Sequence, residues 1–297
     1  MRLIVHLILG LMDKRLRERI SLDSALGGRI DVTQFRFPID SESSDFLQIV
    51  DLAMKLDLGL YWTPWIEYST GELRECRWFE IWPRKRVFES EADRQVNQSR
   101  FNESVNVETL PGLFVRIQPS IRLCKIKLSS DSIGNLGENS MELIVGARAA
   151  EALSKASLRG YDLKPIETGR NGEVHADFWF LFTNNFLPCR ANRDLTIVGD
   201  ERILESAGGL RRLGSLSYLA HSIPLDSDAF RTAEGWHGGQ PLWIVSRRFT
   251  EIFKVNSLKG LSFRPVLSID TPLYRRYREC FERLFSLMAE NSKNRLW

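Results

Sequence analysis

The feature that most constrains this chain is a segment that occurs twice, one hundred residues apart. Residues 141–166 read MELIVGARAAEALSKASLRGYDLKPI, and residues 241–266 read PLWIVSRRFTEIFKVNSLKGLSFRPV. The two copies align without a gap and share residues at matching positions: Ile144 and Ile244, Val145 and Val245, Arg148 and Arg248, Glu151 and Glu251, Gly160 and Gly260, Pro165 and Pro265. One such unit is too small to bury its own apolar face, so doubling it builds a scaffold.

Each copy carries the pattern of a strand, a helix and a second strand. The short apolar runs Leu143–Val145 and Trp243–Val245 are followed by apolar residues at helical spacing. We expect Gly160 and Gly260 to take the left-handed conformation that ends a helix, and the next strand to place its proline at an end or an edge. If the strands of one copy are parallel, their crossover is right-handed. The predicted fold is therefore α+β, with two similar strand–helix–strand halves on mixed sheets.

The chain divides into two predicted regions. Residues 1–130 form an N-terminal α+β region, and residues 141–297 form a C-terminal α+β region that contains both copies. The turn-rich residues 131–140 separate the two regions. Residues 89–108 are polar with few apolar anchors, which predicts a mobile loop or linker.

Amphipathic patterns predict two further helices. One begins at Ser43 or Ser44 and ends at Gly59, with apolar residues close to a 3.6-residue period. The other begins at Thr271 and closes the chain. Its apolar face is formed by Leu273, Tyr277, Cys280, Phe281, Leu284, Phe285 and Met288. We expect its arginines to face solvent: Arg275, Arg276, Arg278 and Arg283.

The opening of the chain and the cysteines bear on location in the cell. The apolar segment Leu3–Met12 predicts a buried strand or helix, and a processed signal segment over residues 1–12 is the alternative. The four cysteines are far apart, which is typical of free thiols in a reducing cytoplasm. We therefore expect a cytoplasmic protein without a membrane partner.

The most unusual region is rich in both aromatic and basic residues. It covers residues 61–86, where two strand-like runs flank the turn Ser69–Glu72 and predict an aromatic hairpin. Because alternate residues of a strand face opposite sides, its rings cannot all enter one core. Trp, Tyr and Arg are enriched at interface hot spots, so the hairpin is either a core element with a basic rim or a binding surface. The candidate partner-binding residues are Trp62, Trp65, Trp78, Trp82, Arg84 and Arg86, joined by Trp236 and His237 from a glycine-rich loop.

Composition and motifs give no recognisable catalytic centre. With 41 basic and 38 acidic residues the net charge is only +3, which argues against a dedicated nucleic-acid binder. The sequence holds no nucleotide-binding, hydrolase or metalloprotease motif, so we predict no catalytic residue, no metal and no cofactor. Two alternatives stay open. One is an enzyme with a site near Cys189, His237 and Asp226, and the other is a nucleic-acid-binding module that uses Trp78, Trp82 and Arg84–Arg86.

A resemblance to known proteins covers the second copy. Ile244–Val266 resembles the closing segment of bacterial immunity proteins of polymorphic toxin systems, which end with a strand, Val-Ser or Val-Thr, a helix, and a strand near F-x-P-V. The layout is also similar to the myxobacterial double-CXXCG group, in which a Pro-Cys segment precedes the same unit, as Leu187–Arg193 does here. Asn192 and Arg193 replace that group's second cysteine and its glycine, which puts any zinc role in doubt.

The resemblance implies a non-catalytic function. Such a protein binds a cognate toxin protein, for example one delivered by type VI secretion, and blocks it inside the producing cell or its siblings. Tight inhibition is best served by a few desolvated Trp, Tyr and Arg anchors. The near-neutral charge argues that the toxin is not simply a highly basic nuclease steered by opposite charge.

Overall fold

The computed structural model has an α+β fold, as the sequence predicts, and divides into two compact units. The first unit comprises residues 1–75 and residues 271–296, and the second lies within residues 76–270. The sequence-based boundary at residues 131–140 differs from this division, because the C-terminal helix belongs with the N-terminal residues. The structure describes residues 1–102, 105–110, 113–117, 120–136, 141–168, 173–188, 197–198, 211–212, 214–236 and 240–296.

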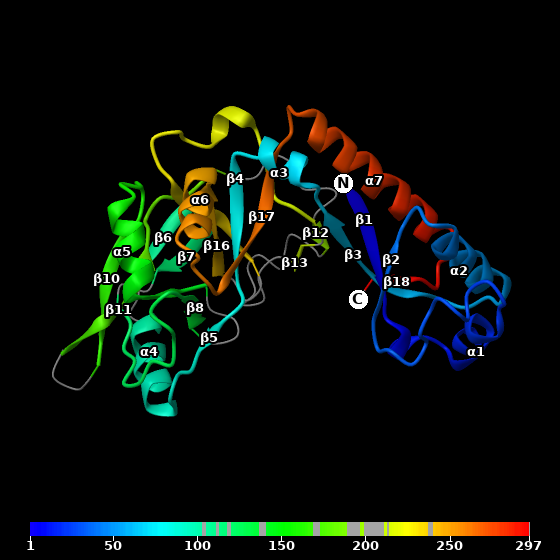
Figure 1. Cartoon of the computed structure of the whole chain (residues 1–297), viewed down its shortest axis with the longest axis horizontal. Helices are drawn as coiled ribbons and strands as arrows, with labels where there is room; N and C mark the ends of the chain where they lie inside the picture. The colour runs from blue at the N-terminus through cyan, green and yellow to red at the C-terminus, as the bar shows by residue number, and fades with distance from the viewer. Residues whose placement is uncertain are drawn as a thin grey trace. The chain divides into compact units, whose positions relative to one another are not determined.

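The first unit is a four-stranded sheet in the order β18-β3-β1-β2 with helices packed on it (Figure 1). Its strands are β1 (Arg2–Leu7), β2 (Phe37–Asp40), β3 (Tyr61–Glu67) and β18 (Arg295–Leu296), and its helices include α1 (Lys14–Leu22), α2 (Ser44–Lys55), α3 (Thr70–Glu75) and α7 (Pro272–Ala289). The opening segment is the buried strand that its apolar pattern predicts, because β1 lies inside the sheet between β2 and β3.

The two amphipathic helices form where the sequence predicts them. Ser43 caps α2 by accepting a hydrogen bond from the backbone N–H of Phe46 at 3.2 Å. Asp57, with φ of 53°, takes the left-handed conformation after this helix, so the predicted end at Gly59 is wrong by two residues. Thr271 caps α7, and its apolar face is buried against the sheet, where the ring of Trp62 meets that of Phe285 at 5.4 Å. The four arginines of α7 are exposed as expected.

The second unit contains two five-stranded mixed sheets, in the orders β10-β11-β9-β8-β5 and β14-β17-β4-β16-β15. The strands of the first are β5 (Arg86–Val87), β8 (Ile133–Leu136), β9 (Leu143–Gly146), β10 (Asp162–Glu167) and β11 (Val174–Phe182). Those of the second are β4 (Trp78–Pro83), β14 (Ser217–Tyr218), β15 (Ala229–Trp236), β16 (Gln240–Ser246) and β17 (Leu261–Ser268). Further elements are α4 (Glu91–Asn102), α5 (Ala147–Lys155), α6 (Arg247–Val255), and the short pairs β6 (Val105–Leu110) with β7 (Leu113–Ile117) and β12 (Ile197–Val198) with β13 (Arg211–Arg212).

Both sequence copies fold into the same strand–helix–strand unit, one in each sheet. In the first copy β9 leads through α5 to β10, and in the second β16 leads through α6 to β17. The two strands of a copy run parallel, because each pairs antiparallel with one strand that lies between them. That inserted strand is β11 in the first copy and β4 in the second. The predicted strand–helix–strand unit is therefore confirmed, with one further strand inserted between its two strands.

The inserted strands extend the repeat. The partner of Gly146 is Phe178, and that of Ser246 is Trp78; likewise Lys164 pairs with Phe180 and Arg264 with Glu80. The offset of one hundred residues thus relates β4 to β11 as well as the two copies. In chain order β4 precedes the first copy and β11 precedes the second, yet each lies in the sheet of the other copy. The two repeats exchange their first strands, which ties the two sheets together.

Reciprocal contacts join the copies around an approximate twofold relation. Arg148 of α5 donates to the carbonyl of Asn256 at the end of α6, at 3.2 Å, and Arg248 of α6 donates to the carbonyl of Ala156 at the end of α5, at 2.8 Å. Helices α5 and α6 accordingly lie side by side (Figure 1). Arginine recurs at this position because it serves the same contact twice.

The glycines that recur in the copies allow a close approach of the other repeat. Gly160 and Gly260 have φ of 91° and 94°, and a Cβ on Gly260 would lie 1.9 Å from the carbonyl oxygen of Ile133. The residue that ends each helix in the left-handed region is Ser157 or Ser257, with φ of 51° and 52°. The expectation that the glycines end the helices is therefore wrong, although their positive φ is confirmed.

Two other expectations are corrected. The aromatic hairpin over residues 61–86 does not form, because β3 pairs with β1 in the first unit and β4 with β16 and β17 in the second, and α3 separates them. The polar stretch at residues 89–108 contains α4 instead of a loop. Its buried face is polar, and Asp93 and Asn97 bond the backbone of Cys124 and Arg122. A helix anchored in this way lacks the apolar stripe by which helices are recognised.

Candidate functional site

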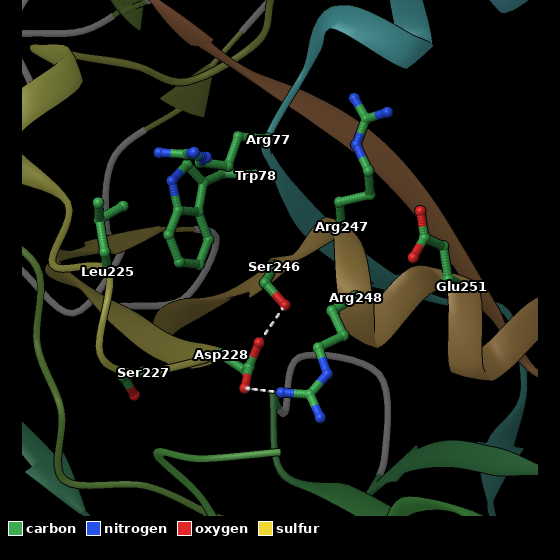
Figure 2. A pocket seen from close by; sticks show the side chains of 9 residues that line it. All are labelled: Arg77, Trp78, Leu225, Ser227, Asp228, Ser246, Arg247, Arg248 and Glu251. Atoms are coloured by element: carbon green, nitrogen blue, oxygen red, sulfur yellow. Dashed lines mark hydrogen bonds and ion pairs between the residues drawn. The ribbon is translucent and has the colours of Figure 1, made fainter. Parts of the chain in front are cut away.

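The second copy carries an open hollow at the start of α6, with a volume of about 420 Å³. It is lined by Arg77, Trp78, Leu225, Ser227, Asp228, Ser246, Arg247, Arg248 and Glu251. Figure 2 shows Trp78 and Leu225 on one side, Arg247 and Glu251 on the other, and Ser246 and Asp228 between them. All of these residues belong to the second unit. This volume is within the range of about 300–1,000 Å³ that is typical of ligand-binding pockets.

A short hydrogen-bond network fixes the floor of the hollow. Ser246 caps α6 by accepting from the backbone N–H of Phe249, at 3.2 Å, and its hydroxyl donates to the carboxylate of Asp228, at 2.6 Å (Figure 2). Asp228 also accepts from the backbone N–H of Arg159, at 3.0 Å, and lies 3.9 Å from the guanidinium of Arg248. Asp228 is therefore occupied by the scaffold and holds the second copy against the loop that follows α5.

Tyr161 packs beside this network. Its ring meets that of Phe249 edge-on at 6.3 Å, and its hydroxyl donates to the carbonyl of Leu153 at 3.0 Å. Burial, and next the nearby Asp228 carboxylate, raise the pKa of Tyr161 to about 12. The phenol stays neutral at physiological pH and acts as a structural donor.

The rim of the hollow is basic. Arg247 donates through Nε to the carbonyl of Cys76, at 3.0 Å, and its backbone N–H bonds the carbonyl of Arg77, at 2.8 Å. The side chain of Arg77 is exposed, and within the described parts of the chain it has no hydrogen-bond or ion-pair partner. Trp78 beneath it is buried, with its ring against Phe230 at 5.5 Å. The hollow thus presents an exposed cation next to a buried aromatic ring.

The corresponding place in the first copy is closed. There the chain folds over the start of α5, where the backbone N–H of Ala149 donates to the carbonyl of Ser130 at 3.0 Å. A side chain at Gly146 would lie 2.6 Å from the carbonyl oxygen of Ser129, so this position accepts only glycine. Asp177 and Ala147 stand where the second copy has Arg77 and Arg247. Only the second copy combines the opening with the two extra arginines.

The structure separates the aromatic residues that the sequence grouped as a binding surface. Trp62 is 3% exposed and Trp78 is 7% exposed, so both belong to cores, the first in unit one and the second in unit two. Trp65 on β3 is 39% exposed. Trp82 on β4 is partly buried beneath the guanidinium of Arg264, at 4.2 Å from the ring.

The remaining candidates lie elsewhere. Arg84 precedes β5 and Arg86 begins it; both are exposed, and neither lines the hollow. Trp236 ends β15, and its side chain, like all of His237 and Cys189, lies outside the described residues. Asp226, the third candidate of the enzyme alternative, is exposed.

Among the described residues there is neither a cluster of metal ligands nor a helix that could span a membrane. No three His, Cys, Asp or Glu side chains within the described ranges converge as metal ligands would. In those same ranges every helix is too short or too polar to cross a lipid bilayer. No protein-family model matches the chain, and no curated protein is significantly similar to it.

Sequence reasoning missed the hollow because it compared the copies for what they share. The differences between the copies indicated the hollow, since Arg247 is aligned with Ala147 and Ser246 with Gly146. The contribution of Arg77 could not be found in that way. The relation of β4 to β11 appears only in the strand pairing, because their sequences share little beyond aromatic content.

Proposed function

We propose that this protein is an immunity protein, which binds a cognate bacterial toxin in the cytoplasm and neutralises it without catalysis. The observation that carries the proposal joins the sequence and the structure. The segment that resembles immunity proteins, Ile244–Val266, begins in β16 and supplies the helix α6, whose first turn lines the hollow. This is also the place where the second copy departs from the first.

The residue types at the hollow support a protein partner. Arginines and Trp78 line the hollow, and arginine and tryptophan are enriched at the hot spots of protein interfaces. A rigid scaffold of exchanged strands also suits an inhibitor, because a preformed surface loses little entropy on binding.

Capture followed by a neutralisation assay tests the proposal. The tagged protein is purified from its native cells at high salt, and a retained polypeptide is identified by mass spectrometry and expressed in a host cell with and without this protein. We expect the polypeptide alone to arrest growth and co-expression to restore it. A retained polypeptide that is harmless, or whose toxicity is unchanged by co-expression, contradicts the proposal.

A further inference from the structure

We infer that the hollow at the start of α6 binds an acidic segment of the partner protein, with Arg77 and Arg247 as the residues that recognise its carboxylates. The inference rests on the proposed function, because it names the surface and the chemistry by which a toxin would be held.

Residues needed by the scaffold should recur in both copies, since both build the same strand–helix–strand unit. Arg148 and Arg248 recur and make the same contact, as do Lys164 and Arg264, each of which lies over an aromatic ring of the inserted strand. The scaffold forms in the first copy with Asp177 and Ala147 in place of Arg77 and Arg247. The unit therefore folds without an arginine at either position, although in the second copy the guanidinium of Arg247 also bonds the carbonyl of Cys76.

A difference between the copies can also serve a core, and the pair Arg231 and Glu142 shows how. Arg231 is fully buried, and its guanidinium bonds both carboxylate oxygens of Glu142, at 3.2 and 2.8 Å. Asn135 corresponds to Arg231 and Leu242 to Glu142, so the other copy has neither charge. The two charges that occur once therefore neutralise each other inside the molecule. Arg77 differs because its side chain faces solvent and has no partner within the described residues.

Charge selects an acidic ligand. Three arginines and two carboxylates line the hollow, and one of the carboxylates, Asp228, is already engaged by Ser246, the Arg159 backbone and Arg248. A guanidinium binds a carboxylate through two parallel hydrogen bonds, which makes arginine the preferred residue for this recognition. The three arginines and two carboxylates together give the lining a net charge of +1, and Arg77 is the arginine among them that faces solvent without a partner in the described residues.

One feature favours a protein segment over a nucleic acid. Leu225 is 69% exposed at the edge and offers apolar surface to a neighbouring side chain of a peptide. An acidic segment with an adjacent apolar residue matches both the charge and the rim.

A binding titration with a synthetic hexaglutamate peptide tests the site without knowledge of the partner. The test variant is the double substitution Arg77→Asp with Arg247→Ala, which installs the residues of the first copy. Lys254→Glu, at the far end of α6 and outside the hollow, is the control, and it lowers the net charge by two, as Arg77→Asp alone does. We expect the double variant to weaken peptide binding at least about 10-fold and the control to stay within about 2-fold of the parent. Equal binding by the double variant and the control overturns the inference.

Three further measurements separate loss of folding, the class of ligand and the proposed function. Arg77→Asp alone serves if the double variant melts at a lower temperature, because the Arg77 side chain makes no hydrogen bond or ion pair among the described residues. Tighter binding of a single-stranded oligonucleotide of equal charge than of hexaglutamate overturns the assignment to a protein segment. Once a toxin is captured, the double variant should bind it at least about 30-fold more weakly. A toxin bound equally by parent and variant contradicts the site alone, whereas Arg77-dependent peptide binding without any toxin contradicts the proposed function alone.

Discussion

The two copies of the repeat share a fold and differ in what they leave open. In the first copy the chain closes over the start of α5, and in the second the start of α6 lines an arginine-rimmed hollow. The contacts that recur, such as those of Arg148 and Arg248, report what the scaffold requires. A contact or side chain that occurs in one copy alone either stabilises the core of that copy or lies on a surface available to a ligand.

The largest effect should come from the core asymmetry. Arg231→Met removes the guanidinium that bonds both oxygens of the buried Glu142 carboxylate, and we expect the free energy of unfolding to fall by about 3–5 kcal/mol. Urea denaturation measures the change. The double variant Arg231→Met with Glu142→Leu should recover most of the loss, since it removes both charges and gives position 142 the leucine of the second copy. A double variant no more stable than the single one would contradict this explanation.

The recurrent glycines should respond unequally. Gly260→Ala places a methyl group 1.9 Å from the backbone oxygen of Ile133, whereas at Gly160 the backbone oxygen of Ala229 would be 2.8 Å away and the nearer Ser227 hydroxyl, at 1.7 Å, belongs to a side chain that can rotate. Both positions have positive φ. We expect Gly260→Ala to lower the free energy of unfolding by about 3 kcal/mol or more and Gly160→Ala by about 1–2 kcal/mol. Equal losses would show that the backbone conformation, and not the approach of the other copy, sets the cost.

The reciprocal arginines should matter less, because both are exposed. Arg148→Ala removes one hydrogen bond to the end of α6, and Arg248→Ala removes its counterpart together with the ion pair to Asp228. We expect losses of at most about 1 kcal/mol in the free energy of unfolding, with the larger one for Arg248→Ala. Thermal melts of the two variants side by side compare them. A larger loss of stability for Arg148→Ala would contradict the contribution assigned to the ion pair between Arg248 and Asp228.

The smallest effect concerns acid stability. Lys259 and the hydroxyl of Ser129 hold the pKa of Asp131 well below its usual range, while the second copy has the neutral Ser227 at this place. A depressed pKa stabilises the folded state above about pH 4 and loses that contribution as the pH falls toward the folded pKa. Asp131→Asn should therefore differ in stability from the parent at neutral pH and converge with it in strong acid. A stability difference between parent and variant that does not depend on pH would contradict a contribution from the ionised Asp131.

Much of the local structure could be predicted from periodicity. The strands and helices of both copies, the capped helices at Ser43 and Thr271 and the α+β class follow from apolar spacing and cap residues. These signals are local, and the structure confirms them. The helix α4 escaped because its buried face consists of Asp93 and Asn97, whose hydrogen bonds to residues 122–124 no apolar pattern records.

What could not be predicted is the arrangement over long distances. The aromatic runs around Trp62 and Trp78 were joined into one hairpin because they are close in sequence, yet they pair with strands far away. The exchange of β4 and β11 depends on which sheet each strand enters, and their sequences do not record it. The hollow depends in turn on that exchange, because β4 brings Arg77 and Trp78 to the start of α6.

Hydrogen–deuterium exchange of the protein with and without its captured toxin tests the central claim most directly. We predict slower exchange on binding at Arg77–Trp78, at residues 225–228 and at the first turn of α6. The equivalent positions of the first copy, residues 146–151 and 177–178, serve as the internal reference and should be unchanged. Protection confined to the first copy or to the first unit, with residues 246–251 exchanging as in the free protein, would contradict the claim that the second copy carries the binding site.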